Sequence, residues 1–222
     1  MIINSLQRVT LLGGGEATSA DLSVALNYAP CLVAADSGAA LAVAHGAKLS
    51  AVIGDMDSLL PDVRARLPTD IVHRIDEQDT TDFDKALRNI VAPAVIGVGF
   101  LGGRVDHELA VLNTLIRRPS PMCILLGARD VIFVAPPAIQ LDLPAGTRVS
   151  LFPLRRVSGH STGLRWPIAG LEFEPGGLIG TSNSANGPVS LAFDQPGMLV
   201  ILPKSFLPCV LDALGPARCA VQ

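Results

Sequence analysis

Short apolar runs recur through the first 135 residues of the chain, and each run is continuously apolar instead of alternating with polar residues. Runs of this kind are typical of strands that are covered on both faces, as in parallel sheets. We expect strands at residues 9–12, 32–35, 51–53, 71–72, 94–98, 123–126 and 131–134.

Segments with helical spacing separate these runs. The clearest segment has apolar residues at i, i+3, i+4, i+7 and i+8, which is the pattern of a helix with one buried face. Its residues are Phe83, Ala86, Leu87, Ile90 and Val91. Because strands and helices alternate, the sequence predicts an α/β domain over residues 1–135, built on a doubly wound, mainly parallel sheet.

The pattern changes at Pro136-Pro137. Beyond this point the helical periodicity disappears, and Gly and Pro residues recur at close spacing as far as Pro196-Gly197. Short apolar segments at 148–152, 189–193 and 198–202 lie between these turn signals, which is typical of all-β folds. We therefore expect a smaller all-β sandwich or barrel domain over residues 136–222.

Charge and hydrophobicity exclude some partners. The formal net charge is −3 and the 17 Lys and Arg residues are scattered, so no basic stripe for a nucleic acid is present. The hydrophobic fraction of 49% raises the question of a membrane. However, the densest apolar stretch, residues 90–103, contains Pro93 and four glycines and is shorter than the roughly 20 residues of a spanning helix. The amino end also lacks a signal-peptide pattern, so we expect a cytoplasmic protein without a membrane partner.

Cysteines do not indicate a metal or redox site. The four cysteines form no Cys-x-x-Cys pair. Cys31 and Cys123 lie inside apolar runs and are expected to be small buried hydrophobic residues, whereas Cys219 is expected to be exposed.

Carboxylates follow several of the predicted strands. Asp55 and Asp57 lie in residues 54–58, Asp79 and Asp82 in residues 78–82, and Asp106 in residues 102–107. Open α/β sheets bind ligands beyond the carboxyl ends of their strands. Oxygen ligands gathered there suit Mg²⁺, which binds a few carboxylates together with substrate phosphates. The sequence thus predicts phosphoryl chemistry on a nucleotide.

Each cluster also has a purely structural interpretation. Asp55 and Asp57 are suited either to a divalent ion or to a turn in which their side chains accept backbone N–H groups. Thr81 and Asp84 resemble a helix cap, which puts Asp82 in the first turn of the helix. We expect Asp84 only to complement the helix dipole.

The third cluster combines Gly102-Gly103 with Arg104, before a helix expected at about residues 106–117. Paired glycines allow backbone N–H groups to approach a phosphate, and the Arg104 guanidinium matches phosphate oxygens. The alternative is a plain turn with a surface arginine. No Gly-x-Gly-x-x-Gly spacing begins at Gly13-Gly14-Gly15 after the first strand, and the sequence contains no P-loop, so the P-loop and protein-kinase classes are excluded.

Taken in chain order, these motifs resemble the thiamine pyrophosphokinase family. The matching segments are residues 33–38, with Asp36, then residues 53–58, 79–82 and 102–107. The resemblance continues into residues 161–166 and 181–184, and it covers nearly the whole chain, from about Gly13 to Leu202. Two positions depart from the family pattern: Ser37 replaces a glycine, and Gln78 stands where bacterial relatives often have a lysine.

The resemblance implies an amino-terminal α/β domain, a carboxyl-terminal β-sandwich, and a homodimer that holds thiamine between domains of different subunits. ATP and Mg²⁺ are then the co-substrate and the cofactor. Asp55, Asp57 and Asp82 resemble ligands of Mg²⁺ or of ATP phosphates, and Arg104 resembles a phosphate clamp. The remaining implied roles are supporting acids near the phosphates at Asp79 and Asp106, either of them a candidate base, and nucleotide contacts at Asp36, Gln78, Gly102 and Gly103.

For thiamine itself, the resemblance implies that Trp166 stacks on the pyrimidine ring and that Ser182, Asn183 and Ser184 line the same pocket. A lone tryptophan in a β-rich domain is otherwise usually part of the core. Two alternative functions share some of these features. A hydroxymethylpterin-type diphosphokinase is expected to lack the segments at 162–166 and 181–184, and a non-catalytic nucleotide or thiamine sensor is expected to have lost the metal carboxylates.

Overall fold

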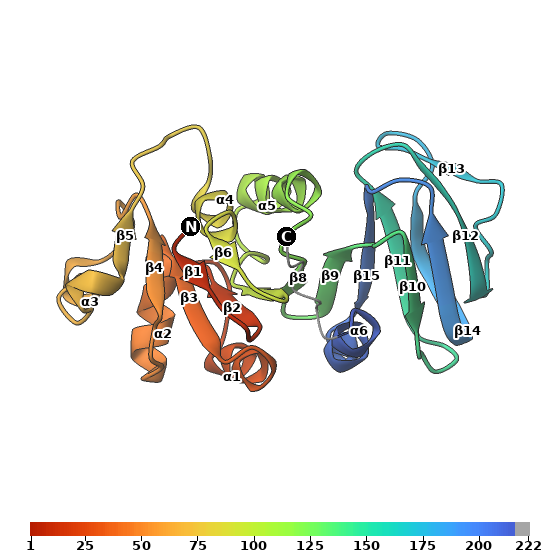
Figure 1. Ribbon diagram of the computed structural model, residues 1–222. Coiled ribbons are helices and arrows are strands. Elements are labelled where there is room, and N and C mark those ends of the chain that lie inside the picture. The colour runs from red at the N-terminus through yellow and green to blue at the C-terminus, as the bar shows by residue number, and fades with distance from the viewer. Residues whose placement is uncertain (216–222) are drawn as a thin grey trace. The chain divides into compact units, whose positions relative to one another are not determined.

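The computed structural model describes residues 1–215, and these form two compact units (Figure 1). The first unit comprises Met1–Ala128, and the second begins at Arg129, a few residues before the change in composition at Pro136. Cys219 lies outside the described residues.

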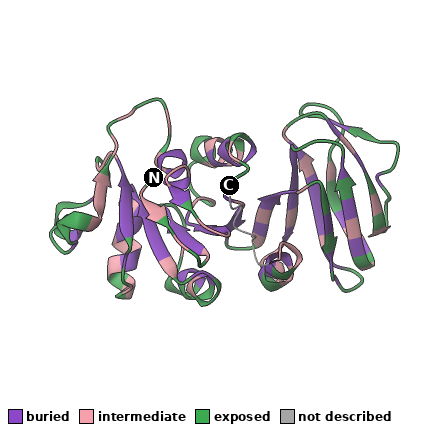
Figure 2. Ribbon diagram, in the orientation of Figure 1, coloured by how far each residue is buried: buried purple, intermediate pink, exposed green. Residues whose placement is uncertain are grey.

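A parallel sheet forms the centre of the first unit, in the strand order β8-β7-β2-β3-β4-β5. The chain builds outward from β2 in one direction to β5 and then returns to the other side of β2 with β7 and β8, so the sheet is doubly wound as predicted. Its strands are β2 (Val9–Leu12), β3 (Cys31–Ala35), β4 (Ala51–Gly54), β5 (Val72–Arg74), β7 (Val95–Val98) and β8 (Cys123–Leu126). Figure 2 shows β2, β3 and β4 as mostly buried, which agrees with their continuous apolar runs.

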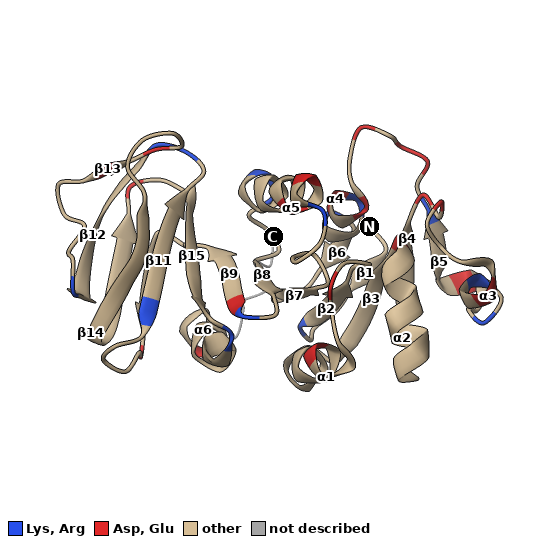
Figure 3. Cartoon of the chain, turned by 180° about the vertical axis from the view of Figure 1, so that it is seen from behind, with Lys and Arg blue, Asp and Glu red and all other residues tan. Residues whose placement is uncertain are grey.

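Helices cover this sheet on both sides. The helix α4 packs on β3 and β4, and α1 packs on β2 and β7. Figures 1 and 3 show α1 and α2 on the opposite side of the unit from α4 and α5. The helices are α1 (Ser19–Tyr28), α2 (Ala39–His45), α3 (Pro61–Arg64), α4 (Asp82–Leu87) and α5 (Val105–Arg117).

The predicted helix over residues 83–91 is wrong in its second half. The helix α4 ends at Leu87, where the Asn89 side chain donates to the Lys85 carbonyl oxygen at 2.8 Å. Ile90–Val91 then form the short strand β6, which pairs in parallel with β1 (Ile3–Asn4). The apolar spacing continues because Ile90 is buried in this strand pairing instead of on a helix face.

Antiparallel strands form the second unit, in the order β13-β12-β14-β11-β15-β9, with β10 also paired to β14. The long strand β14 joins two layers, because its first half pairs with β11 and its second half with β10 and β12. The strands are β9 (Asp130–Val134), β10 (Ala138–Leu141), β11 (Arg148–Pro153), β12 (Val157–Leu164), β13 (Glu172–Phe173), β14 (Gly180–Phe193) and β15 (Met198–Pro203). The expected all-β domain is confirmed, and one helix, α6 (Leu207–Ala213), packs on β10.

The run at residues 131–134 is continuously apolar, like the predicted strands of the first half. In the structure it belongs to the second unit, where β9 pairs antiparallel with β15.

Among the other predicted features, Cys123 is buried and burial raises its pKa to about 12, whereas Cys31 is only half-buried. Within residues 1–215, no helix has the length and apolar character needed to cross a membrane.

Candidate active site

A cavity of about 750 Å³ opens in the first unit, where several loops follow the carboxyl ends of the parallel strands. Its walls come from the loops after β2, β3, β4 and β7 and from the amino ends of α4 and α5. This is the position at which a doubly wound sheet offers a binding crevice. The lining residues that carry the chemistry are Asp36, Asp55, Asp82, Lys85, Arg104 and Glu108.

Three carboxylates converge beside this cavity. Oxygen atoms of Asp36, Asp55 and Asp57 all lie within 4.8 Å of one another. Asp55 and Asp57 follow β4 and Asp36 follows β3, so neighbouring strands of the sheet bring them together. The Ser58 hydroxyl donates to Asp57 at 2.8 Å, and the Asp57 N–H donates to Asp55 Oδ1 at 3.3 Å.

Asp36 is the buried member of this group, with 2% of its surface exposed. The Ser58 N–H donates to its Oδ2 at 3.1 Å, while its buried Oδ1 has no hydrogen-bond partner in the part of the chain that the structure describes. Burial raises the pKa of Asp36 to about 6, and the charges of Asp82, Asp55 and Asp57 add to this effect against the hydrogen bond from Ser58. A buried carboxylate with an unpaired oxygen is costly, and a cation beside it would remove that cost.

Lys85 is a functional candidate that the sequence pattern did not single out. Its side chain is only 2% exposed, and its Nζ donates to Asp55 Oδ2 at 2.7 Å and to Asp82 Oδ1 at 3.1 Å. Burial by itself lowers the pKa of Lys85, but the hydrogen bonds to Asp55 and Asp82 outweigh it, so its pKa is raised. The hydrogen bond from Lys85 in turn lowers the pKa of Asp55.

The expected trio of Asp55, Asp57 and Asp82 is therefore arranged differently from a simple three-carboxylate cluster. Asp55 and Asp57 lie together, and Asp36 is the third carboxylate within 4.8 Å. Asp82 is linked to Asp55 through the ammonium group of Lys85. The spacing of Asp82 and Lys85, at i and i+3 on one helix face, is a sequence signal that could have indicated this link.

The amino end of α4 is capped as predicted. The Thr81 hydroxyl accepts the Asp84 N–H at 3.3 Å, and Asp82 begins the helix. The prediction that Asp84 only complements the helix dipole is wrong. Asp84 is 1% exposed and forms ion pairs with Arg118 and Arg117 at the end of α5, so it connects the two helices.

Gln78 and Asp79 lie exposed in the loop before α4, which carries a run of acidic residues (Figure 3). The described residues that line the cavity include Thr80 and Thr81 but neither Gln78 nor Asp79. Glu77 holds this loop to α4, because it accepts hydrogen bonds from Arg88 at 2.5 and 3.1 Å and from Thr80 at 2.6 Å. The bonds from Arg88 and Thr80 lower the pKa of Glu77 to about 2.

The glycine pair is already engaged by a carboxylate of the chain. The N–H groups of Gly102 and Gly103 donate to Glu108 Oε1 at 2.8 and 2.9 Å. Gly102 has a φ of +80°, a backbone conformation that glycine adopts readily. The donors that the sequence assigned to a phosphate thus bind Glu108, a residue that the sequence analysis did not single out.

Arg104 and Asp106 pair with each other on the surface, with guanidinium-to-carboxylate distances of 2.5 and 3.1 Å. The hydrogen bond between them raises the pKa of Arg104 and lowers the pKa of Asp106. Arg104 lines the cavity, whereas Asp106 is absent from the described lining. Arg104 would have to exchange Asp106 for a phosphate in order to act as a clamp.

In the second unit, Trp166 follows β12 and is 53% exposed, so the alternative that it belongs to the core is wrong. The Arg165 guanidinium lies over its ring, 4.7 Å from the centroid. A tryptophan held open in this way can stack on a flat ring or a cation.

Asn183 anchors the Trp166 loop. Its Oδ1 accepts the Trp166 N–H at 3.2 Å and the Ser184 N–H at 2.8 Å, and its Nδ2 donates to the Trp166 carbonyl oxygen at 2.7 Å. Asn183 is buried, whereas Ser182 is exposed and has a φ of +62°. Asn183 thus positions Trp166, while Ser182 and the half-buried Ser184 are more accessible.

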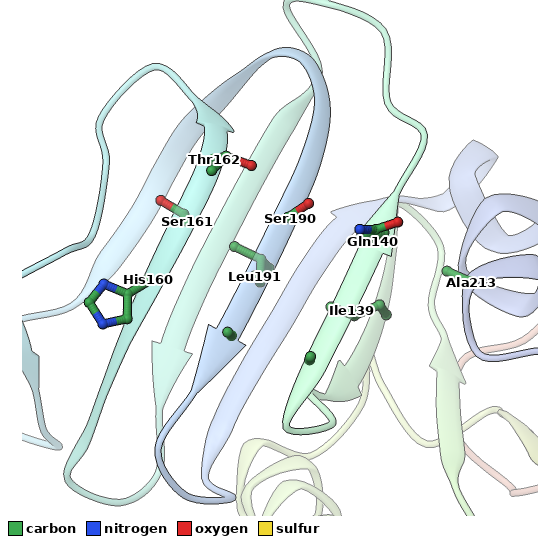
Figure 4. A pocket seen from close by; sticks show the side chains of 10 residues that line it. Ile139, Gln140, His160, Ser161, Thr162, Ser190, Leu191 and Ala213 are labelled. Atoms are coloured by element: carbon green, nitrogen blue, oxygen red, sulfur yellow. The ribbon is translucent and has the colours of Figure 1, made fainter.

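A second hollow, of about 660 Å³, lies in this unit across β10, β12 and β14 (Figure 4). His160, Ser161 and Thr162 line it from β12, and Ala138, Ile139 and Gln140 from β10. Its described lining includes neither Trp166 nor Ser182–Ser184. The residues expected to bind thiamine are therefore gathered elsewhere in the unit.

Comparison with known proteins gives consistent matches for both units. Residues 22–125 match the family model described as "Thiamin pyrophosphokinase, catalytic domain", and residues 138–198 match "Thiamin pyrophosphokinase, vitamin B1 binding domain". Thiamine pyrophosphokinase 1 of Arabidopsis thaliana is 35% identical over 164 residues, which is 65% of this chain and 61% of the relative. A relative from Caenorhabditis elegans is 27% identical over 150 residues, or 60% of each chain. The chain thus spans about three fifths of the length of these relatives.

Solved structures share the fold. Thiamin pyrophosphokinase from Candida albicans has a TM-score of 0.76 at 18% identity, with 89% of both chains covered. The enzyme of the same name from Geobacillus thermodenitrificans has a TM-score of 0.72 at 22% identity, covering 91% of this chain and all of the other. At these identities the structures establish the fold, while the family models carry the assignment.

Proposed function

Because the chain belongs to the thiamin pyrophosphokinase family, we propose that it transfers the pyrophosphoryl group of ATP to the hydroxyl of thiamine, giving thiamine diphosphate and AMP. The observation that carries this proposal is the convergence of Asp36, Asp55 and Asp57 beside the cavity of the catalytic unit. The exposed Trp166 in the second unit supports thiamine as the acceptor.

The three converging carboxylates of Asp36, Asp55 and Asp57 suit Mg²⁺. Carboxylate oxygens are the ligand type that Mg²⁺ prefers, and the unpaired, buried Asp36 Oδ1 is the kind of atom that a cation would satisfy. We assign Asp55 and Asp57 as ligands and add Asp36 to them, with Asp82 close by through Lys85. When bound, the ion supplies positive charge to the phosphate oxygens.

The residues of the chain would contribute mainly positioning and charge, because phosphoryl-type transfer needs little covalent help. Arg104 is the proposed clamp on the transferred phosphates, and Gly102, Gly103 and Gln78 are proposed contacts of the nucleotide. Asp79 and Asp106 remain the two candidates for the group that takes the thiamine hydroxyl proton.

Trp166 is the proposed stacking surface for thiamine. Arg165 over its ring supports this role, because it indicates that the ring face accepts a flat cation. Ser182 and Ser184 are proposed to contact the substrate, and Asn183 to hold the loop that presents Trp166.

One assay tests the function. The chain is incubated with ATP, Mg²⁺ and thiamine, and AMP and thiamine diphosphate are quantified, with a hydroxymethylpterin as the control acceptor. Equal formation of AMP and thiamine diphosphate is expected, with no product from the pterin. Product from the pterin alone would identify the related diphosphokinase, and binding of both ligands without turnover would identify a sensor.

A homodimer with thiamine bound between subunits and a cytoplasmic location complete the proposal. Both come from the resemblance and the sequence. Light scattering on the purified chain would test the dimer, and cell fractionation would test the location.

A further inference from the structure

We propose that the ammonium group of Lys85 is a built-in cation that takes the place of a second divalent ion, so that the carboxylate cluster holds a single divalent ion bound by the protein. This inference goes one step beyond the proposed function, on which its metal site rests. It concerns how many ions the protein itself holds when no nucleotide is bound.

The position of Lys85 is fixed from two directions. It lies on α4 one turn after Asp82, while Asp55 follows β4 and comes from a different part of the chain. Its Nζ lies 2.7 Å from Asp55 Oδ2 and 3.1 Å from Asp82 Oδ1, with the side chain 2% exposed. A buried ammonium group is costly unless it is paired, so these two carboxylates hold it in place.

The ammonium occupies the position between Asp55 and Asp82 where a shared metal ion was expected from the sequence. Asp55 binds Lys85 through its Oδ2. Its other oxygen, Oδ1, accepts the Asp57 N–H at 3.3 Å and so lies on the side of Asp57. On that side lies the buried Asp36, whose Oδ1 has no partner among the described residues. The carboxylates thus form two neighbouring cation positions. The Lys85 ammonium group occupies the one between Asp55 and Asp82, and oxygens of Asp36, Asp55 and Asp57 surround the other.

Charge supports the same division. The carboxylates of Asp36, Asp55, Asp57 and Asp82 carry −4 when ionised, and Lys85 reduces this sum to −4 + 1 = −3. One divalent ion brings the group to −1, whereas two would make it positive. Without the ammonium, the Asp55 and Asp82 oxygens that now bind it would lose their shared counter-charge, and two negative groups on either side of one position favour a cation there.

A different role for Lys85 is a contact with the nucleotide phosphates, because Lys85 also lines the cavity. In that case a neutral replacement would weaken nucleotide binding and leave the number of bound ions unchanged. The ion pairs argue against this role, since a phosphate would have to compete with both Asp55 and Asp82 for the ammonium group. Counting ions in the absence of nucleotide separates the two roles.

The test is a titration with Mn²⁺ in the absence of nucleotide, with free Mn²⁺ followed by electron paramagnetic resonance. We expect one ion per chain for the wild type and two for Lys85→Met, which keeps an unbranched side chain one atom shorter than lysine and removes its charge. Lys48→Met makes the same substitution at an exposed position of the same unit and is expected to bind one ion. Two ions on the wild type, or one ion on Lys85→Met, would overturn the inference.

A double variant covers the case in which Lys85→Met does not fold. Lys85→Met with Asp82→Asn removes one carboxylate together with the ammonium, so it should bind one ion, as the wild type does. Two ions on this variant would also overturn the inference. The proposed function is judged separately: a wild type that makes no thiamine diphosphate contradicts the function, even if the ion counts are as expected.

Discussion

At the scale of single residues, Asp36 is a buried acid. Its burial in the folded chain makes the charged carboxylate less favourable than the protonated form. Its pKa of about 6 lies above the ordinary value of 3.8. The folded state therefore binds this proton more tightly than the unfolded state, and the resulting stabilisation, present at acid pH, is lost as the pH rises through about 6.

We expect the folding stability of Asp36→Asn to lack this decrease with rising pH. Without metal, in EDTA, the variant should be more stable than the wild type at pH 7.5 by up to ~3 kcal/mol, and the difference should vanish near pH 4. Hydrogen exchange of the β4 amides is a suitable measurement, because Trp166 lies in the other unit and its fluorescence does not report on this one. A difference that stays constant between pH 4 and 7.5 would contradict the prediction.

Glu108 leads to a prediction about nucleotide affinity. It binds the N–H groups of Gly102 and Gly103, so a phosphate that uses these donors has to displace a negative charge. Glu108→Gln should therefore lower the Michaelis constant for ATP by roughly fivefold, which corresponds to ~1 kcal/mol. Glu174→Gln, at an exposed position of the second unit, serves as the control. An increase of the Michaelis constant in Glu108→Gln would instead make Glu108 a support of the loop.

Some of these residues were predictable from the sequence and others were not. Asp55 and Asp57 were predictable because they follow a strand directly, and the structure brings them together. The pairing of Lys85 with Asp82 could have been expected from their i, i+3 spacing, but its burial and its bond to Asp55 could not, because they depend on tertiary contacts of α4 with β4. Glu108 was missed because its contact with the glycine pair depends on how the chain turns before α5.

At the scale of elements, the contact between α4 and α5 supports the active-site loops. Asp84 on α4 is buried and pairs with two arginines at the end of α5: Arg117, the last residue of the helix, and Arg118, which follows it. Both helices carry residues of the cavity on their amino-terminal sides, so this pairing fixes elements that hold the site.

Asp84→Asn should destabilise the first unit by ~2 kcal/mol, because the buried carboxylate loses its charge-assisted contacts while Arg117 and Arg118, which are 53% and 29% exposed, stay partly solvated. Urea unfolding followed by far-ultraviolet circular dichroism, together with hydrogen exchange of α4, measures this. Glu172→Gln removes the partner of Arg156 on the surface of the second unit and should have little effect. Equal effects of the two substitutions would contradict the role given to Asp84.

The elements themselves were mostly predictable, and their exact ends were not. The runs at 9–12, 51–53 and 123–126 became buried parallel strands because their burial on both faces leaves a continuous apolar pattern. Residues 90–91 fitted the helical period equally well, but pairing with β1 competes with one more helical turn. Periodicity alone does not distinguish these outcomes for short apolar runs.

At the scale of the whole molecule, the two units divide the proposed function between them. The carboxylates belong to the first unit and Trp166 to the second, and each unit matches a different family model. The change in composition at Pro136 indicated this division, but the second unit already begins at Arg129. The difference arises from β9, whose apolar run resembles the parallel strands, although it pairs antiparallel with β15.

This division predicts that turnover and thiamine binding can be impaired separately by substitutions in the two units. Asp57→Asn should reduce turnover by ~100-fold or more, because a group aimed at the metal and the phosphates is lost, while thiamine binding is unchanged. Trp166→Ala should mainly raise the Michaelis constant for thiamine, because stacking stabilises the bound substrate and the transition state alike.

Direct binding measurements sharpen the prediction, because Trp166 is the only tryptophan in the chain. Quenching of its fluorescence should give the same dissociation constant for thiamine in the wild type and in Asp57→Asn. Binding of ADP and Mn²⁺, measured by calorimetry, should in turn be the same in the wild type and in Trp166→Ala. If Asp57→Asn weakened thiamine binding, or Trp166→Ala weakened nucleotide binding, the carboxylates and the tryptophan would have to act on one shared ligand.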